Sequence, residues 1–216
     1  MFIELHAQSA FSFLEAAEQP ETLAEEAARL DMPALALVDR DGVYGAPRFF
    51  RAMTKLGLRA IVGSEITLED GARLLLLVED REGYQNLCRL ITKAKLSESP
   101  ATLDDVEEYA EGLVGLTGTA AAHLDRLLGI FGRSSCFVEI QRHLDREEER
   151  RARRLIALAD RYRVPLVATN QPTYCRPGGR AVADVLTCMR EHTDLDHAGR
   201  RLTRNAERSL KSGRAM

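Results

Sequence analysis

The side chains most able to do chemistry in this sequence are histidines and carboxylates that recur beside short apolar segments. They are His6 and Glu15 near the first segment, Glu65 after the third, and Glu139 and His143 at and beyond the sixth. Imidazole and carboxylate groups that converge on one place are the ligand set of a hydrolytic metal site, in which divalent ions activate water and bind a phosphate.

Arginines occupy equivalent positions beside other apolar segments. Arg40 follows the second segment and Arg73 opens the fourth. A buried carboxylate such as Glu65 needs either a metal or a cationic side chain as its partner. Because two guanidiniums are available and only His6 and His143 could supply imidazole ligands, these residues by themselves indicate an ion-pair network as strongly as a metal site.

The elements that must position these side chains are short apolar runs that alternate with amphipathic charged segments, a pattern typical of strand and helix in repetition. Runs that are almost entirely apolar favour parallel strands covered on both faces. In an α/β barrel the residues that follow the strands meet at one mouth, so a closed or nearly closed barrel fits the pattern, although periodicity alone also allows an open doubly wound sheet. Strands are predicted at 2–6, 34–38, 59–62, 74–78, 113–117, 136–140 and 165–168, and helices at 21–30, 47–56, 83–95, 103–110, 144–162 and 181–190.

Composition excludes several classes of protein. The chain has 216 residues, of which 45% are hydrophobic and 29% charged, and this length allows one well-packed α/β domain rather than a disordered or collagen-like chain. The net charge of −3 excludes a generally basic surface that coats nucleic acid. Four dispersed cysteines form no CxxC pair, and no signal peptide or membrane-spanning run is recognisable, so we expect a cytoplasmic protein with reduced thiols and no membrane partner.

Two charged segments stand out near the carboxyl end. The predicted helix 144–162 carries Glu147 with Arg151 and Glu149 with Arg153 at i, i+4 spacing, which is typical of a solvated helix face. The tail after residue 199 is strongly basic, with Glu207 as its one acid. It could contact nucleic acid or an acidic surface of another domain, or be a loosely attached end; its candidate contact residues are Arg200, Arg201, Arg204, Arg208 and Lys211.

Six ordered motifs resemble those of a known family: FIELHAQSAFSFLEAA, MPALALVDRDGVYGAPRFF, LRAIVGSEITL, REGYQNLCRLITKAKL, CFVEIQRH and PLVATNQPTYCRP. The chain is similar to the amino-terminal PHP (polymerase and histidinol phosphatase) domain of bacterial DNA polymerase III alpha subunits, and the similarity continues through DVLTCMREHTDLD and RLTRNAERSLKS. VDRDGVYGAPRFF and LTRNAERSLKS favour the error-prone type. The resemblance implies a distorted seven-stranded, TIM-like (β/α) barrel over residues 1–176 and a helical, basic segment over 177–216 that leads toward a palm domain outside this chain.

The resemblance also implies nine ligands for two or three divalent metals. His6, Glu15, Glu65 and His143 agree with family ligands, whereas five positions are substituted: Gln8, Arg40, Arg73, Gln171 and Thr173. Each guanidinium would repel a divalent ion by about 2 kcal/mol at about 4 Å even in water. We therefore expect no cofactor, or at most one weakly bound Zn²⁺ or Mn²⁺.

In place of the metals, the hypothesis is that two arginines act as counterions to the acids of the mouth, because a guanidinium can hold two carboxylates and does not lose its proton. The proposed network consists of Arg40, Arg73, Glu65, Glu15 and Asp39. The alternative is that Arg40 extends from its turn to the surface.

Three functions follow as hypotheses. The first is a non-catalytic PHP module that supports a DNA polymerase in replication or in translesion synthesis during repair. Its partners would be the palm and thumb of the same polymerase, which would bind DNA and carry the nucleotidyltransferase activity outside these residues. The second is an active metal-dependent phosphoesterase that uses the four retained ligands. The third is a module that binds DNA or a polymerase partner through its basic tail.

Overall fold

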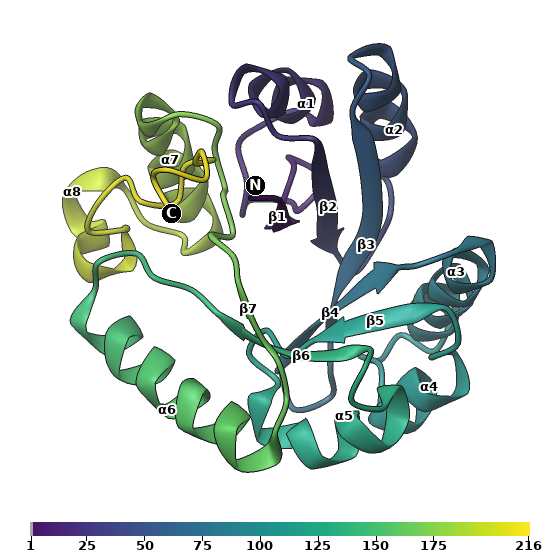
Figure 1. Ribbon diagram of the computed structural model, residues 1–216. Helices are drawn as coiled ribbons and strands as arrows, with labels where there is room; N and C mark the ends of the chain where they lie inside the picture. Colours follow the sequence, from purple (N-terminus) through teal and green to yellow (C-terminus); the bar gives the residue numbers. More distant parts are fainter. Residues whose placement is uncertain (1) are drawn as a thin grey trace.

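A curled sheet of seven strands forms the centre of the computed structural model, which describes residues 2–216 (Figure 1). The strands follow one another across the sheet in sequence order, and helices cover its outer side. This mixed α/β half-barrel confirms the predicted barrel-type fold. The strands are β1 (Glu4–Ala7), β2 (Ala34–Arg40), β3 (Arg59–Thr67), β4 (Arg73–Val78), β5 (Leu113–Leu116), β6 (Cys136–Ile140) and β7 (Leu166–Ala168).

Helices begin where local capping chemistry permits. The Asp80 carboxylate accepts a hydrogen bond from the Gly83 amide at 2.8 Å before α3, and Asp145 caps α6 in the same way. The short helices α5 and α8 lie outside the predicted set. No helix among residues 2–216 has the length and apolar character of a membrane span. The helices are α1 (Pro20–Arg29), α2 (Ala46–Lys55), α3 (Arg81–Leu96), α4 (Leu103–Glu108), α5 (Leu124–Phe131), α6 (Arg146–Tyr162), α7 (Arg180–Arg190) and α8 (Leu195–Ala198).

The direction of β4 differs from the all-parallel arrangement that the apolar runs favoured. β4 pairs antiparallel with both β3 and β5, whereas the other neighbouring strands are parallel. Only residues 68–72 separate β3 from β4, and a parallel pair would need a much longer crossover. β4 therefore begins at the end of the curl where the other six strands finish, and we call this end the mouth.

Apolar clusters fill both faces of the sheet. The outer clusters bury α1 and α2 against the first strands, and α3 to α6 against the later ones. The third cluster draws only on strand residues, so it lies inside the curl and forms the floor below the mouth. Its members are Ala36, Val38, Leu75, Leu77 and Leu116, with the partly buried Leu5, Ile61, Val114, Phe137 and Val167.

The C-terminal segment packs along the opening between β1 and β7. The Asn170 side-chain amide donates to the carbonyl oxygens of Glu207 and Ser209 at 2.8 and 2.6 Å, and the Leu210 amide donates to the Tyr174 carbonyl at 3.1 Å. Leu210 is only 4% exposed and belongs to the cluster under α1 and α2. This segment therefore stabilises the edge of the sheet that no strand covers.

Leu210→Ala is expected to lower the free energy of unfolding by about 2 to 5 kcal/mol, because it removes a buried side chain and leaves a cavity. Urea denaturation followed by circular dichroism would measure the change. Leu195→Ala is the matched control, since Leu195 is 54% exposed and its truncation should have little effect. Equal losses in the two variants would contradict the packing of this segment on the barrel.

Candidate functional site

Four charged residues continue the inner face of the sheet above its apolar floor. Alternate residues of a strand share one face, and Arg40, Glu65 and Glu139 lie two or four residues beyond inner-face apolar residues of β2, β3 and β6. Arg73 lies two residues before Leu75, at the start of the antiparallel β4. All four line a cavity of about 690 Å³ at the mouth.

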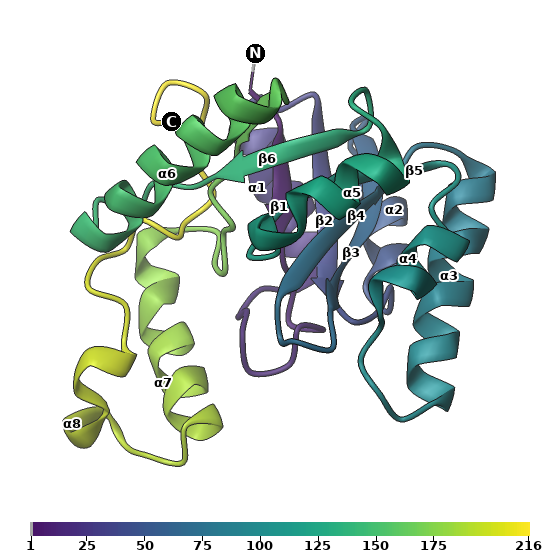
Figure 2. The ribbon, with the colours of Figure 1, turned by 90° about the horizontal axis from the view of Figure 1, so that it is seen from below.

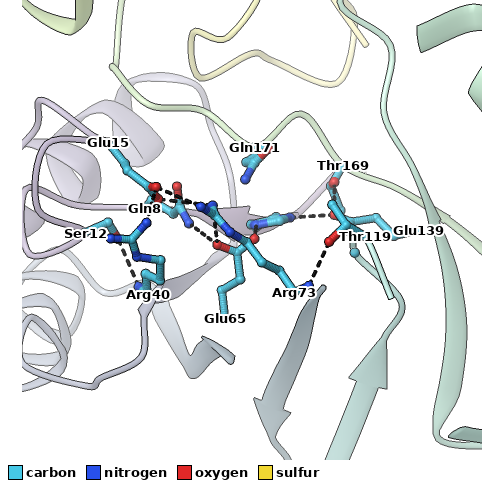
Figure 3. A network of polar contacts seen from close by, with 12 residues as sticks. Gln8, Ser12, Glu15, Arg40, Glu65, Arg73, Thr119, Glu139, Thr169 and Gln171 are labelled. Carbon is cyan, nitrogen blue, oxygen red and sulfur yellow. Dashed lines mark hydrogen bonds and ion pairs between the residues drawn. The ribbon is translucent and has the colours of Figure 1, made fainter. Parts of the chain in front are cut away.

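Arg73 connects two of the carboxylates. Its guanidinium lies 2.9 Å from Glu15 Oε1 and 3.3 Å from Glu65 Oε2, and Arg40 also pairs with Glu15 (Figure 3). The Glu15 and Glu65 side chains are 9% and 2% exposed, whereas each arginine is about one-third exposed. The fold thus brings Glu15, from the loop after β1, and Glu65, from β3, into ion pairs with partly exposed arginines at the cavity.

His6 lies between a carboxylate oxygen of Glu139 and one of Glu65. Its Nδ1 atom is 2.7 Å from Glu139 Oε1 and its Nε2 atom is 3.3 Å from Glu65 Oε1, and all three side chains are only 2% exposed. Burial alone would lower the pKa of His6, but Glu139 and Glu65 outweigh it and raise this pKa to about 10. Glu139 and Glu65 therefore favour the protonated, imidazolium form of His6.

With His6 protonated, the positive and negative charges at the mouth balance. Burial raises the pKa values of Glu65 and Glu139, but interactions with His6 outweigh burial and keep both below the usual glutamate value. With Glu15, the cluster has three carboxylates, and His6, Arg40 and Arg73 supply three positive charges. We call these six residues the mouth cluster.

Two side-chain amides and one hydroxyl group donate further hydrogen bonds to the carboxylates of Glu65 and Glu139. Gln8 donates from Nε2 to Glu65 Oε2 at 3.0 Å, and Gln141 donates to Glu139 Oε1 at 3.2 Å. The Thr169 hydroxyl also donates to Glu139. Gln8 thus acts as a hydrogen-bond donor to Glu65, one of the predicted site acids.

Asp39 does not join the mouth cluster, which corrects its predicted place in the arginine network. Its carboxylate accepts hydrogen bonds from the Ser9 amide at 2.7 Å, the Ser9 hydroxyl at 2.8 Å and the Ser12 hydroxyl at 2.9 Å. The side chain of Asp39 alternates with that of Arg40 along β2, so the two residues face opposite sides of the sheet. Asp39 instead holds the loop that carries Glu15.

His143, a predicted metal ligand, does not line the cavity that His6, Glu15 and Glu65 line. Its Nε2 atom is 2.7 Å from the Asn170 carbonyl oxygen and its Nδ1 atom is 2.9 Å from Glu148 Oε2. Burial raises the pKa of Glu148, but His143 and Arg208 outweigh this effect and lower it to about 2. His143 thereby joins the segment after β6 to the segment after β7.

Two further predicted site residues and two arginines of the basic tail line the cavity: Gln171, Thr173, Arg201 and Arg208. Gln171 Oε1 accepts a hydrogen bond from Arg208 at 2.9 Å. Arg200 is exposed. Three tail cations form ion pairs within the chain: Arg204 with Asp145, Arg208 with Glu148, and Lys211 with Glu207.

Two buried acids lie outside the predicted site residues. Glu139 was placed among the polar positions but received no role, and Glu4 was not singled out. Glu4 is fully buried and accepts hydrogen bonds from the amides of His6 and Asn170, both at 2.9 Å, while burial raises its pKa to about 7. For both residues the sequence signal is a glutamate within a mostly apolar strand segment, which indicates a buried carboxylate.

Comparison with known proteins assigns the family. The model of the PHP domain matches residues 4–164, and the chain belongs to this family. Among curated relatives, it is 39% identical to an error-prone DNA polymerase of Anaeromyxobacter sp. (strain K), over 97% of this chain and 20% of the relative. It is 35% identical to that of Mycolicibacterium paratuberculosis, over 100% of this chain and 23% of the relative. The chain thus spans about a fifth of these polymerases and matches their PHP domain.

Solved structures support the fold. A candidate metal-dependent phosphoesterase from Bifidobacterium adolescentis superposes with a TM-score of 0.59 at 15% identity, covering 78% of this chain and 86% of that one. A lesion-specific endonuclease from Pyrococcus furiosus gives a TM-score of 0.51 at 13% identity, covering 79% of this chain and 48% of that one. At these identities the similarity establishes the architecture alone.

Proposed function

We propose that this chain is a non-catalytic PHP domain that acts as a structural support for an error-prone type of DNA polymerase. The observation that carries the proposal is the mouth cluster, in which three cationic side chains balance three acids. Relatives with this domain are about five times longer than the chain, so polymerisation would belong to residues beyond it. In this proposal residues 1–176 form the support and 177–216 lead toward the palm, within the cytoplasm.

The residues at the mouth do not fit a two-metal site. Such a site needs anionic or neutral imidazole ligands on both ions, whereas His6 already bonds Glu139 through Nδ1, and its Nε2 atom lies 3.3 Å from Glu65 Oε1 without a hydrogen bond. A guanidinium stays protonated at any physiological pH, so Arg40 and Arg73 would repel a divalent ion permanently. The same charges remove the need for a metal, because every buried acid of the cluster has a cationic partner.

The cluster can hold the barrel together without catalysis. His6 joins β1 to β3 and β6, and Arg73 joins β4 to β3. Both arginines also hold the loop after β1 through Glu15. A mouth held rigid in this way supports a module that presents fixed surfaces to the rest of a polymerase.

Metal titration tests this proposal. Isothermal calorimetry with Mn²⁺ and with Zn²⁺ is expected to show no saturable binding below about 1 mM metal, because the pocket already contains fixed positive charge. A phosphomonoesterase assay with added Mn²⁺ should likewise release no phosphate above the rate without protein. Stoichiometric binding at micromolar metal, or metal-dependent phosphate release, would instead support an active phosphoesterase.

A further inference from the structure

The solvent-facing side of α6 consists largely of arginine. Leu155 and Ala159 are the buried residues of this helix and face the sheet. At 3.6 residues per turn, five exposed arginines lie on the opposite side, and no acid lies at the centre of that side. We call them the α6 ridge: Arg146, Arg150, Arg153, Arg154 and Arg161.

Of the acids on α6, Glu148 and Glu149 pair with other parts of the chain, whereas Glu147 and Asp160 are exposed at the flanks of the ridge and form no ion pair within residues 2–216. The i, i+4 pairs expected within the helix do not form among the described residues: Glu149 pairs with Arg142 at 3.3 Å, and Arg151 donates to the Gly118 carbonyl at 3.2 Å. Glu148 turns inward to His143 and Arg208. Within residues 2–216, the guanidiniums of the ridge are therefore left without carboxylate partners.

We propose that the α6 ridge binds the phosphate backbone of duplex DNA. The ridge extends for about 22 Å along the helix axis, which is the length of duplex that presents about six phosphates of one strand. Arg146, Arg150 and the pair Arg153 and Arg154 follow one another at about one helical turn, or about 5 to 6 Å, and Arg161 lies about two turns further on; guanidinium groups bind phosphate oxygens with two parallel hydrogen bonds. Contacts of this kind carry no base specificity.

The ridge lies on the face of α6 that points away from the mouth, although the basic tail contacts the amino-terminal end of this helix through Asp145 and Glu148. α6 lies on the outer side of the molecule in both ribbon views (Figures 1 and 2). In the tail, by contrast, Arg204, Arg208 and Lys211 are paired with acids of this chain. Arg200 and Arg201 of the tail are exposed as well, but the five ridge arginines form the longer continuous cationic row, and DNA binding there does not depend on whether the mouth holds a metal.

The test is fluorescence anisotropy of a labelled duplex of about 20 base pairs, titrated with the full chain at about 50 to 200 mM salt. The variant Arg146→Gln, Arg150→Gln, Arg153→Gln should bind about 10- to 100-fold more weakly at the lowest salt. The slope of log K against log salt should become shallower by about 2.7, since each lost phosphate contact removes about 0.9. Arginine-to-lysine changes at the same positions should retain binding within about threefold, because they retain the charge.

A charge-matched control distinguishes DNA binding at the ridge from nonspecific electrostatic attraction between DNA and any cationic surface of the protein. Arg51, Lys55 and Arg59 are exposed at α2 and the start of β3, on the other side of the molecule from α6 (Figure 1). Replacing these three by glutamine removes the same charge and should leave binding unchanged. Equal weakening by both glutamine variants, absence of binding by the native chain, or binding to phosphatidylserine vesicles without binding to DNA would each overturn the proposal.

Discussion

A variant that carries, at five positions, the metal ligands implied by the family resemblance is expected to bind Mn²⁺ or Zn²⁺ at least about 1,000-fold more tightly than the native chain. Removing two guanidiniums relieves a repulsion of about 2 kcal/mol each, and about 4 kcal/mol corresponds to three powers of ten in affinity. The new side chains also add imidazole and carboxylate donors. The changes are Gln8→His, Arg40→His, Arg73→His, Gln171→Asp and Thr173→His, and calorimetry measures the result.

A second variant separates charge from ligand chemistry. Arg40→Gln with Arg73→Gln removes the same two charges but adds no ligand, so its affinity should fall between those of the native chain and the restored variant. A native chain that binds metal as tightly as the restored variant would show that the arginines do not block the site. If the restored variant folds but does not bind metal more tightly than the native chain, the explanation that Arg40 and Arg73 prevent metal binding is also contradicted.

His6→Ala is expected to lower the free energy of unfolding by about 3 to 5 kcal/mol at neutral pH. The change leaves Glu65 and Glu139 buried without the cation that lies between them, and an uncompensated buried charge is strongly destabilising. His123→Ala is the matched control, because His123 pairs with Asp70 at a surface where both side chains are at least 30% exposed. That exposed pair should contribute no more than about 1 kcal/mol.

The pH dependence of stability provides an independent measure of the same interaction. The folded pKa of His6, about 10, lies above its ordinary value of 6.5. The contribution of His6 is therefore fully present below about pH 6.5 and is lost as the pH rises through about 10. Urea denaturation across this range should show declining stability in the native chain and a smaller decline in His6→Ala. Parallel declines in the two proteins would contradict an imidazolium between the carboxylates.

Several features of the site could be predicted because they depend on residues close in sequence. The β6 segment is predicted with the bounds that the structure has, and most other elements agree within a few residues, since apolar runs and helical periodicity are local signals. Arg73 was assigned to the start of β4 correctly. The antiparallel direction of β4 was missed because an apolar run reports burial on both faces and not strand direction.

Side-chain direction and distant partners account for what was missed. The prediction for Asp39 was wrong because it lies on the other face of β2 from Arg40 and accepts hydrogen bonds from Ser9 and Ser12. Glu139 received no role because its partner, His6, is 133 residues away in the sequence. The basic tail presented a row of charges in the sequence, but its acidic partners, such as Asp145 and Glu148, belong to another part of the chain.

By itself, the sequence determined the order of strands and helices, the family and the positions at which charged side chains follow the strands, since all of these are encoded in residue types and short spacings. Tertiary structure alone decided which acid meets which cation. Curling the sheet brings β1, β3, β4 and β6 to one mouth, so His6, Arg73, Glu65 and Glu139 become neighbours there. Coulomb interactions depend on distance and on exclusion of water, and both are set only when the chain folds.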